Sequence, residues 1–141
     1  SALFVIYIIC IVYFLIFSDM FGRGGYTERR YNLHPLQEIQ RFITYGDQMS
    51  PMSVFLNLYG NIIAFIPFGM LLRWARNKNT TLLQAFLYSL VFTLTIETAQ
   101  YITKLGVFDV DDIIMNTLGG VIGYGIYYVT AKLIRRYHAK K

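Results

Sequence analysis

Four long apolar segments restrict what this chain can fold into. They run from Ala2 to Phe17, Val54 to Trp74, Leu82 to Ile102 and Ile113 to Ile134. At a rise of about 1.5 Å per residue, the last three can each cross a hydrocarbon core of about 30 Å as an α-helix, and the first falls slightly short. We therefore predict an all-α membrane bundle of about four transmembrane helices. It forms a single domain over 1–141, with spans at about 2–18, 54–74, 82–102 and 113–134.

Composition supports a membrane protein over a soluble one. Hydrophobic residues make up 55% of the chain and charged residues only 15%, with a mean hydropathy of +0.43. A soluble domain usually carries about 25% charged residues. A single cysteine, Cys10, excludes an intrachain disulfide framework. No small-residue cleavage site precedes Asp19, so we expect the first segment to be a retained helix, not a cleaved signal peptide.

The basic residues predict how the helices are oriented. Eight Lys and Arg residues, five of them in the tail Lys132–Lys141, fall on the side that would hold both chain ends. The other side holds five basic residues and all eight acids, so the two sides carry +8 and −3. By the positive-inside rule, both termini of this multi-pass membrane protein are predicted to be cytoplasmic. We expect the basic tail to contact anionic lipids, with no nucleic-acid partner.

The longest connection, Asp19 to Pro51, is predicted to contain a short helix at the outer membrane surface. Pro35 suits the first turn of a helix. The apolar side chains that follow at helical spacing are Leu36, Ile39, Phe42 and Ile43. Such an amphipathic segment lies in the plane of the interface, and a simple ordered loop is the alternative.

Polar residues inside or beside the apolar segments are the candidates for function. A charged side chain at the bilayer centre costs about 2.5–3.5 kcal/mol on insertion scales. The candidates are Asn57, Asn61, Glu97, Gln100, Asp109, Asp112 and Asn116. Counted along the predicted helices, Asn61, Glu97 and Asn116 lie within about 12 Å of the outer edge, so we expect one binding pocket in the outer leaflet.

Structural roles remain open for several of these residues. Amides between membrane helices also act as packing contacts worth about 0.6 kcal/mol. A functional role is favoured for Glu97, because a buried carboxylate must be neutral or paired. Asp109 and Asp112 also suit the N-terminus of a helix, and Asp111 is expected to be a solvated loop acid.

Glycines in the last apolar segment predict close helix packing. Gly119, Gly120 and Gly123 include a G-x-x-x-G spacing, and Gly69 is expected to serve the same purpose. The contact could lie within the chain or between protomers of a homo-oligomer.

Recognised catalytic and cofactor motifs are missing from the sequence. His34 and His138 lack metal-ligand spacing, and no P-loop or dinucleotide-binding glycine pattern occurs. We expect no cofactor and no metal. Three carboxylates, Glu97, Asp109 and Asp112, are nevertheless hard oxygen ligands that could hold a divalent cation.

Four motifs in this order resemble the VanZ-like membrane family. They are Asn32-Leu-His-Pro35, the segment Gly60–Gly69, Ile96-Glu-Thr-Ala-Gln100 and the segment Asp109–Gly120, which together cover about residues 32–124. The resemblance implies a small polytopic membrane protein of bacteria, and it adds Asn32 to the candidate pocket. The founding member of the family is associated with resistance to teicoplanin, a lipid-tailed glycopeptide that binds cell-wall precursors. No settled reaction belongs to the family.

Three functional interpretations follow. In the first, the outer pocket binds or shields a lipid-linked cell-wall precursor, another envelope lipid or the lipoglycopeptide antibiotic. In the second, the protein is an enzyme that modifies an envelope lipid or precursor, with Glu97 and Asp112 as catalytic candidates in an acid/base or metal-binding pair. In the third, the polar residues only fix helix packing.

Overall fold

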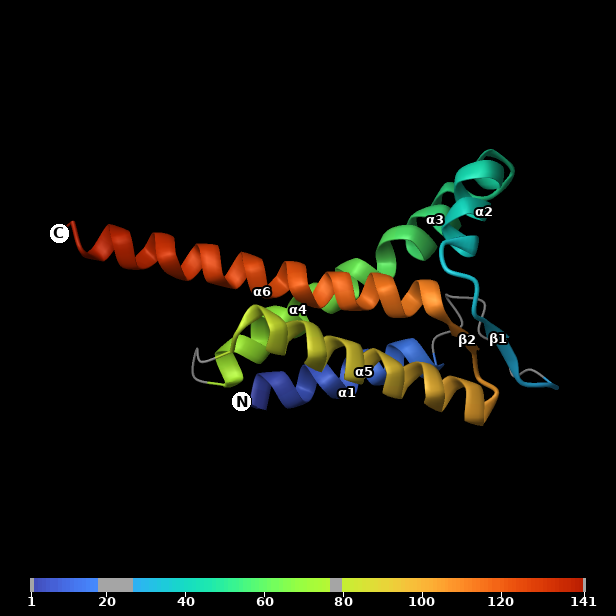
Figure 1. The fold of residues 1–141 in the computed structure, drawn as a ribbon, viewed down its shortest axis with the longest axis horizontal. Coiled ribbons are helices and arrows are strands. Elements are labelled where there is room, and N and C mark those ends of the chain that lie inside the picture. The colour runs from blue at the N-terminus through green and yellow to red at the C-terminus, as the bar shows by residue number, and fades with distance from the viewer. Residues whose placement is uncertain (1, 18–26, 77–79, 141) are drawn as a thin grey trace.

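A computed structural model describes residues 2–17, 27–76 and 80–140, and this part of the chain is mostly helical (Figure 1). The helices are α1 (Ala2–Phe17), α2 (Gln37–Tyr45), α3 (Pro51–Phe55), α4 (Asn61–Ala75), α5 (Leu82–Thr103) and α6 (Val110–His138). A 3-10 turn (Gly46–Gln48) follows α2, and a π-helical turn (Leu56–Gly60) joins α3 to α4. The prediction of a mainly helical protein is confirmed. It missed a small parallel sheet formed by β1 (Arg30–Asn32) and β2 (Val107–Asp109).

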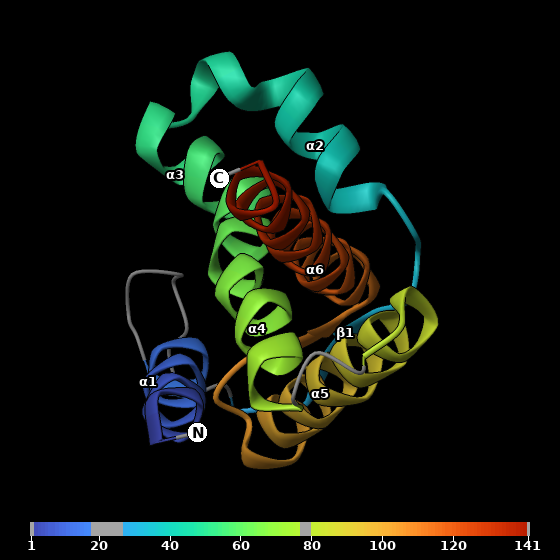
Figure 2. The ribbon, with the colours of Figure 1, turned by 90° about the vertical axis from the view of Figure 1, so that its left-hand side faces the viewer.

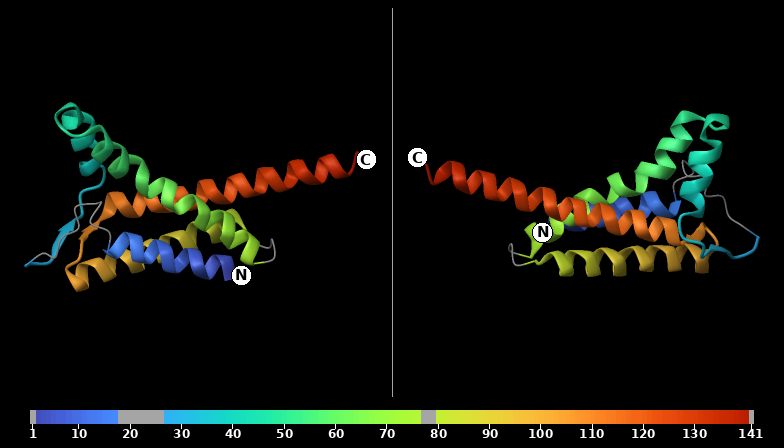
Figure 3. Two further views of the ribbon diagram at one scale, coloured as in Figure 1. Left: turned by 180° about the vertical axis from the view of Figure 1, so that it is seen from behind. Right: turned by 45° about the horizontal axis from the view of Figure 1, so that its top comes forward.

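Helix α4 occupies the middle of the bundle and contacts α1, α5 and α6 (Figure 2). The two strands lie at one end, where α2 and α3 project away from the other helices (Figure 3). Both chain ends lie toward the opposite end, and α6 extends beyond its neighbours there (Figure 1). The bundle therefore has two distinct ends, which are joined by the full length of α6.

The surface of the bundle is apolar and part of its interior is polar, the reverse of a soluble protein. Helix α5 illustrates this inversion, since Leu83 and Val91 are 65% and 60% exposed while Ser89 and Thr93 are fully buried. In the part of the chain that the structure describes, two helices, α5 and α6, are long and apolar enough to cross a membrane. Helices α1 and α4 are shorter apolar helices. The exposed apolar surface and the long apolar helices indicate a membrane protein.

The second apolar segment differs from the single helix predicted over 54–74. A π-helical turn interrupts it at Leu56–Gly60, which leaves α4 with 15 residues. Pro67 lies inside α4, where a proline removes the N–H that would bond the carbonyl four residues before it. In the same turn, the Tyr7 hydroxyl of α1 donates to the Ala64 carbonyl at 2.7 Å. Tyr7 therefore braces α4 at the carbonyl next to the one that Pro67 leaves without its helical donor, that of Ile63.

Backbone contact between α4 and α6 depends on glycines. A Cβ atom at Gly69 would lie 1.8 Å from the Gly120 carbonyl oxygen, and one at Gly123 would lie 1.9 Å from the Ile66 carbonyl oxygen. A Cβ atom at Gly119 would lie 2.3 Å from the Ile62 carbonyl oxygen. The prediction that these glycines serve close helix packing is confirmed, and the contact lies within the chain. Aromatic rings fill the adjacent space between α4 and α5.

We expect Gly69→Ala to destabilise the fold, because the new methyl group would overlap backbone atoms that cannot rotate away. Overpacking usually costs about 1–3 kcal/mol, and this contact places the cost at the upper end of that range. Gly125→Ala is the matched control, since a methyl group added there would meet no described atom within 4 Å. Thermal unfolding in detergent measures both variants. Equal unfolding temperatures for the two would contradict the packing argument.

Candidate functional site

The strand pairing brings two parts of the family-like motif set into contact. In the parallel register, Asn32 of β1 lies opposite Asp109 of β2. The Asn32 side-chain Nδ2 donates to the two carboxylate oxygens of Asp109 at 3.3 and 3.4 Å. Its Oδ1 accepts from the His34 backbone N–H at 3.1 Å. Asn32 therefore links the connection between α1 and α2 to the entry of α6.

Asp109 is the N-cap of α6 and also the point at which α5 attaches. Its carboxylate accepts from the Asp111 backbone N–H at 2.8 Å, as capping aspartates do. Its own backbone N–H donates to Oε2 of Glu97 at 3.0 Å. Glu97 is 1% exposed, so this α5 carboxylate is a buried acceptor for the backbone just before α6. We refer to Asn32, Glu97, Asp109 and Asp111 as the polar network.

Burial raises the pKa of the Asp109 carboxyl above its ordinary value. Hydrogen bonds from the Asp111 backbone and from the Asn32 side chain oppose this shift, and the charge of Asp111 adds to it. Asp109 lies in β2, before α6 begins, so this carboxyl is at the end of the bundle and outside the apolar helices.

Asp111 is buried and structural, so the prediction of a solvated loop acid is wrong. Its carboxylate accepts from the backbone N–H of Leu36 at 2.5 Å and from that of Ile39 at 3.4 Å. The first N–H groups of a helix lack intrahelical partners and attract negative charge. Leu36, the N-cap of α2, offers no side-chain cap and has a φ of 65°. Because α2 has no capping side chain of its own, its first N–H groups need an acceptor from elsewhere in the chain. This missing cap was the signal in the sequence for the role of Asp111.

A second layer of polar groups lies one helical turn further into the bundle. The Asn61 side-chain Nδ2 donates to Oδ1 of Asp112 at 2.5 Å. The Asn116 Nδ2 lies 2.8 Å from Oγ1 of Thr93. The side-chain oxygens of Asn61 and Asn116 are buried and find no donor among the described residues. We refer to Asn61, Thr93, Asp112 and Asn116 as the amide layer.

The orientation of the Asn61 amide follows from its partner. A carboxylate accepts and does not donate when ionised, so the NH₂ group must face Asp112 and the oxygen must face away. Leaving such a buried acceptor unpaired costs about 1–3 kcal/mol. Asn116 contacts a hydroxyl, which can donate or accept, so one half of its amide stays unpaired in either orientation. The amide layer therefore contains hydrogen-bonding capacity that the described chain does not use.

Gln100 and Asn57 stand apart from these groups. The Gln100 Nε2 donates to the Leu15 carbonyl at 2.8 Å, which ties α5 to α1 at a buried position. Although Gln100 and Glu97 were both candidates for one pocket, they bind different neighbours. The side chain of Asn57 lies outside the part of the chain that the structure describes.

Small residues on α5 extend the polar groups into the bundle. Thr93 and Ser89 lie one and two turns before Glu97 on the buried face of α5. Thr93 meets Asn116, and Ser89 faces Gly120, where an added Cβ atom would lie 2.0 Å from the Ser89 Oγ. Sequence reasoning missed Thr93 as a partner, although its four-residue spacing from Glu97 is the signal that would have found it.

The carboxylates of the site accept hydrogen bonds from N–H donors of five elements, β1, β2, α2, α4 and α6. Among the described residues, no group of three or more His, Cys, Asp and Glu side chains is arranged to hold a metal ion. What the arrangement offers chemically is a set of fixed hydrogen-bond acceptors beside an apolar outer surface. Such a set suits a ligand that carries amide, hydroxyl or ammonium donors.

Comparison with known proteins covers nearly the whole chain. The VanZ/LLP1 family profile matches residues 4–133. Protein VanZ of Enterococcus faecium is 33% identical over 131 residues, which is 93% of this chain and 73% of that protein. No solved structure matches the chain. The matched range includes the whole polar network and amide layer.

We expect Asp111→Ala to loosen α2, because two N–H groups at its start lose their acceptor. An unsatisfied buried donor costs about 1–3 kcal/mol, so amide hydrogen exchange in α2 should accelerate about tenfold or more. Hydrogen exchange followed by mass spectrometry of peptides from α2 gives the measurement. Asp47→Ala, in the exposed 3-10 turn that follows α2, is the matched control. Equal exchange in the two variants would rule out the capping role.

Asp109→Asn should change how stability depends on pH. Because the folded state raises the pKa of Asp109, this group stabilises the fold below its ordinary value of 3.8 and loses that contribution as pH rises through the folded value. Asparagine keeps the N-cap and does not titrate. The stability difference, wild type minus variant, should therefore fall as pH rises above 3.8. Unfolding curves in detergent that stay parallel across this pH range would refute the prediction.

Proposed function

The chain belongs to the VanZ/LLP1 family, and from this premise we propose that it lowers bacterial susceptibility to teicoplanin-type lipoglycopeptides. In this proposal it is a multi-pass protein of the bacterial cell membrane with both termini in the cytoplasm. The polar network and the amide layer then lie in the outer half of the bilayer. There they bind the polar part of the drug or of a lipid-linked envelope molecule.

The observation that carries this proposal is the pair of unpartnered amide oxygens in the amide layer. Asn61 and Asn116 come from different helices, α4 and α6, and both offer a buried acceptor beside the same end of α6. Packing alone would favour apolar residues of similar size at these positions, because each unpaired oxygen is costly. A ligand with amide or hydroxyl donors would recover that cost on binding.

The apolar exterior of the bundle supports a ligand that carries a lipid tail. Helices α5 and α6 expose Leu94 and Leu118 at about the depth of the amide layer, with 37% and 47% of their surface accessible. A lipid-tailed molecule whose polar part meets the acceptors would keep its acyl chain against this surface. Binding of this kind would shield the cell-wall precursor or sequester the drug. It would act on lipid-tailed glycopeptides in preference to those without a tail.

Drug susceptibility of a Gram-positive host tests the proposal. Wild type should protect against teicoplanin and leave vancomycin killing unchanged. Asn116→Ala and Glu97→Gln should remove most of the protection, since losing one hydrogen bond to a polar ligand weakens binding up to about tenfold. Leu83→Ala, at an exposed apolar position in the first turn of α5 and away from the amide layer, should keep the protection and is the matched control.

Membrane abundance must be measured for every variant in that experiment. Full protection by Asn116→Ala and Glu97→Gln at wild-type abundance would sink the binding proposal. Loss of protection that follows a loss of protein would instead show that the polar residues act only in folding. Protection against both drugs alike would exclude a role for the lipid tail.

A further inference from the structure

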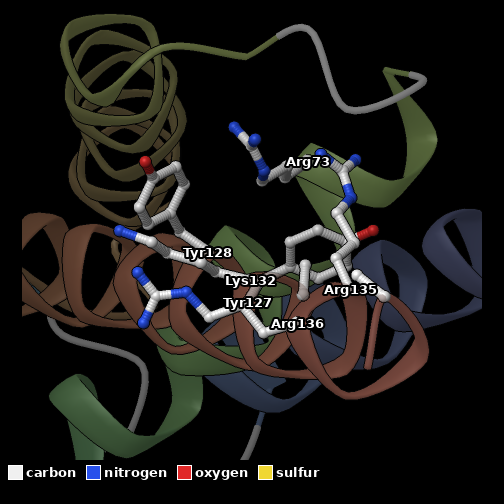
Figure 4. A pocket seen from close by; sticks show the side chains of 8 residues that line it. Arg73, Tyr127, Tyr128, Lys132, Arg135 and Arg136 are labelled. Atoms are coloured by element: carbon white, nitrogen blue, oxygen red, sulfur yellow. The ribbon is translucent and has the colours of Figure 1, made fainter. Parts of the chain in front are cut away.

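A separate cavity lies at the opposite end of the bundle, between α4 and the last part of α6 (Figure 4). It is open to the surface and has a volume of about 310 Å³. Its polar and aromatic lining consists of Arg73, Tyr127, Tyr128, Lys132, Arg135 and Arg136. Arg73 comes from α4, and the other five side chains come from α6. This cavity is far along α6 from the polar network, so the function proposed above does not use it.

The charge of the cavity is positive and is not offset locally. Four of its lining side chains are cations, and no acid is among the described residues that line it. The sequence contains no Asp or Glu between 48 and 96 or between 113 and 141. Gathering like charges raises the free energy of the fold unless an anion joins them. The lining therefore selects an anionic ligand.

Arg73 is held in place at the wall of this cavity. Its Nη1 donates to the Thr80 carbonyl at 2.6 Å and to the Tyr124 hydroxyl at 3.2 Å. Its guanidinium carbon lies 5.1, 5.8 and 5.4 Å from the ring centres of Tyr124, Tyr127 and Tyr128. The Nε atom is shielded from water and finds no acceptor among the described residues. A guanidinium fixed in this way holds its charge at the wall of the cavity, where it is suited to an oxyanion.

We propose that this cavity binds the phosphate group of an anionic phospholipid. Arginine forks donate two parallel hydrogen bonds to phosphate oxygens, and two arginines with a lysine can surround one phosphate. Beside the cavity, α6 exposes apolar side chains such as Val129 and Leu133, at 55% and 59%. Acyl chains would cover this surface, which a water-soluble phosphate compound would leave bare. The site does not depend on the proposed function.

A diffuse attraction between the basic tail and anionic lipids is the competing explanation. Each Lys or Arg near such a surface contributes about 1 kcal/mol wherever it sits. Arg76 separates the two explanations, because it lies three residues after Arg73 yet does not line the cavity. Its Nη1 donates to the Tyr88 hydroxyl at 2.7 Å and it is exposed. Removing either charge changes the diffuse attraction equally, but only Arg73 belongs to the site.

Native mass spectrometry of the full chain in detergent tests the proposal with phosphatidylglycerol and phosphatidylcholine as probes. Wild type should retain phosphatidylglycerol in preference to phosphatidylcholine. Arg73→Gln and Arg135→Gln should each weaken that retention about tenfold, the effect of losing one charge-assisted interaction. Arg76→Gln and Lys140→Gln, which remove charges outside the cavity lining, should retain the lipid as wild type does. Arg135→Gln, at an exposed position, keeps the test valid if Arg73→Gln does not fold.

Three results would overturn the proposal. Equal losses from Arg73→Gln and Arg76→Gln would assign lipid retention to diffuse charge. Equal retention of phosphatidylglycerol and phosphatidylcholine by wild type would remove the preference for an anionic lipid. Displacement of phosphatidylglycerol by inorganic phosphate alone would assign the cavity to a water-soluble phosphate compound.

Discussion

The carboxylates around the start of α6 hold the acidic end of this molecule together. Glu97 binds the backbone before α6, Asp109 binds β1 and caps α6, and Asp111 caps α2. Short strands and a nine-residue helix are too small to be stable alone, so these contacts fix where β1 and α2 lie. The rest of the site depends on this arrangement, because the residues of the amide layer lie next to it on α4, α5 and α6. A buried carboxylate is costly on its own, and here each one is matched to backbone donors that would otherwise be unpaired.

The two ends of the bundle have opposite chemistry. One end gathers acids and amides whose hydrogen bonds join α2, α5, α6 and the strands. The other gathers arginines, a lysine and tyrosines around a cavity. Between them, glycines let α6 lie against the backbone of α4, and the small side chain of Ser89 lets it lie against α5 at Gly120. The contact surfaces in the middle thus carry little that could bind a ligand, and the chemistry is confined to the ends.

Sequence patterns predicted the helices well because apolar length is a direct physical signal. The glycine packing was also predictable, since only close approach explains such spacing in an apolar helix. The hydrogen-bond partners of the polar residues were not predictable from the sequence. Asn32 and Asp109 are 77 residues apart and meet through three-residue strands that leave no periodic pattern. Asp111 looked like a loop acid because its partners are backbone groups of another helix, and backbone groups have no sequence signature. The π-helical turn before Asn61 could not be predicted from the sequence either, because a single such turn leaves no distinct spacing of apolar side chains.

Helix α6 has a consequence for the membrane in which the protein can work. From Asp112 to Lys132 it rises about 30 Å, which equals the thickness of a typical hydrocarbon core. An acid-bearing end and a cation-bearing end on one unbroken helix cannot both reach water in a much thicker bilayer. A thinner bilayer would instead force the helix to tilt, at a cost of fractions of a kcal/mol per Å of mismatch. Because glycines place the backbones of α4 and α6 in direct contact, such a tilt would move both helices together. A protein whose α6 crosses the membrane in this way is matched to a bilayer of about this thickness, and lipid composition would govern where in a cell envelope it is most stable.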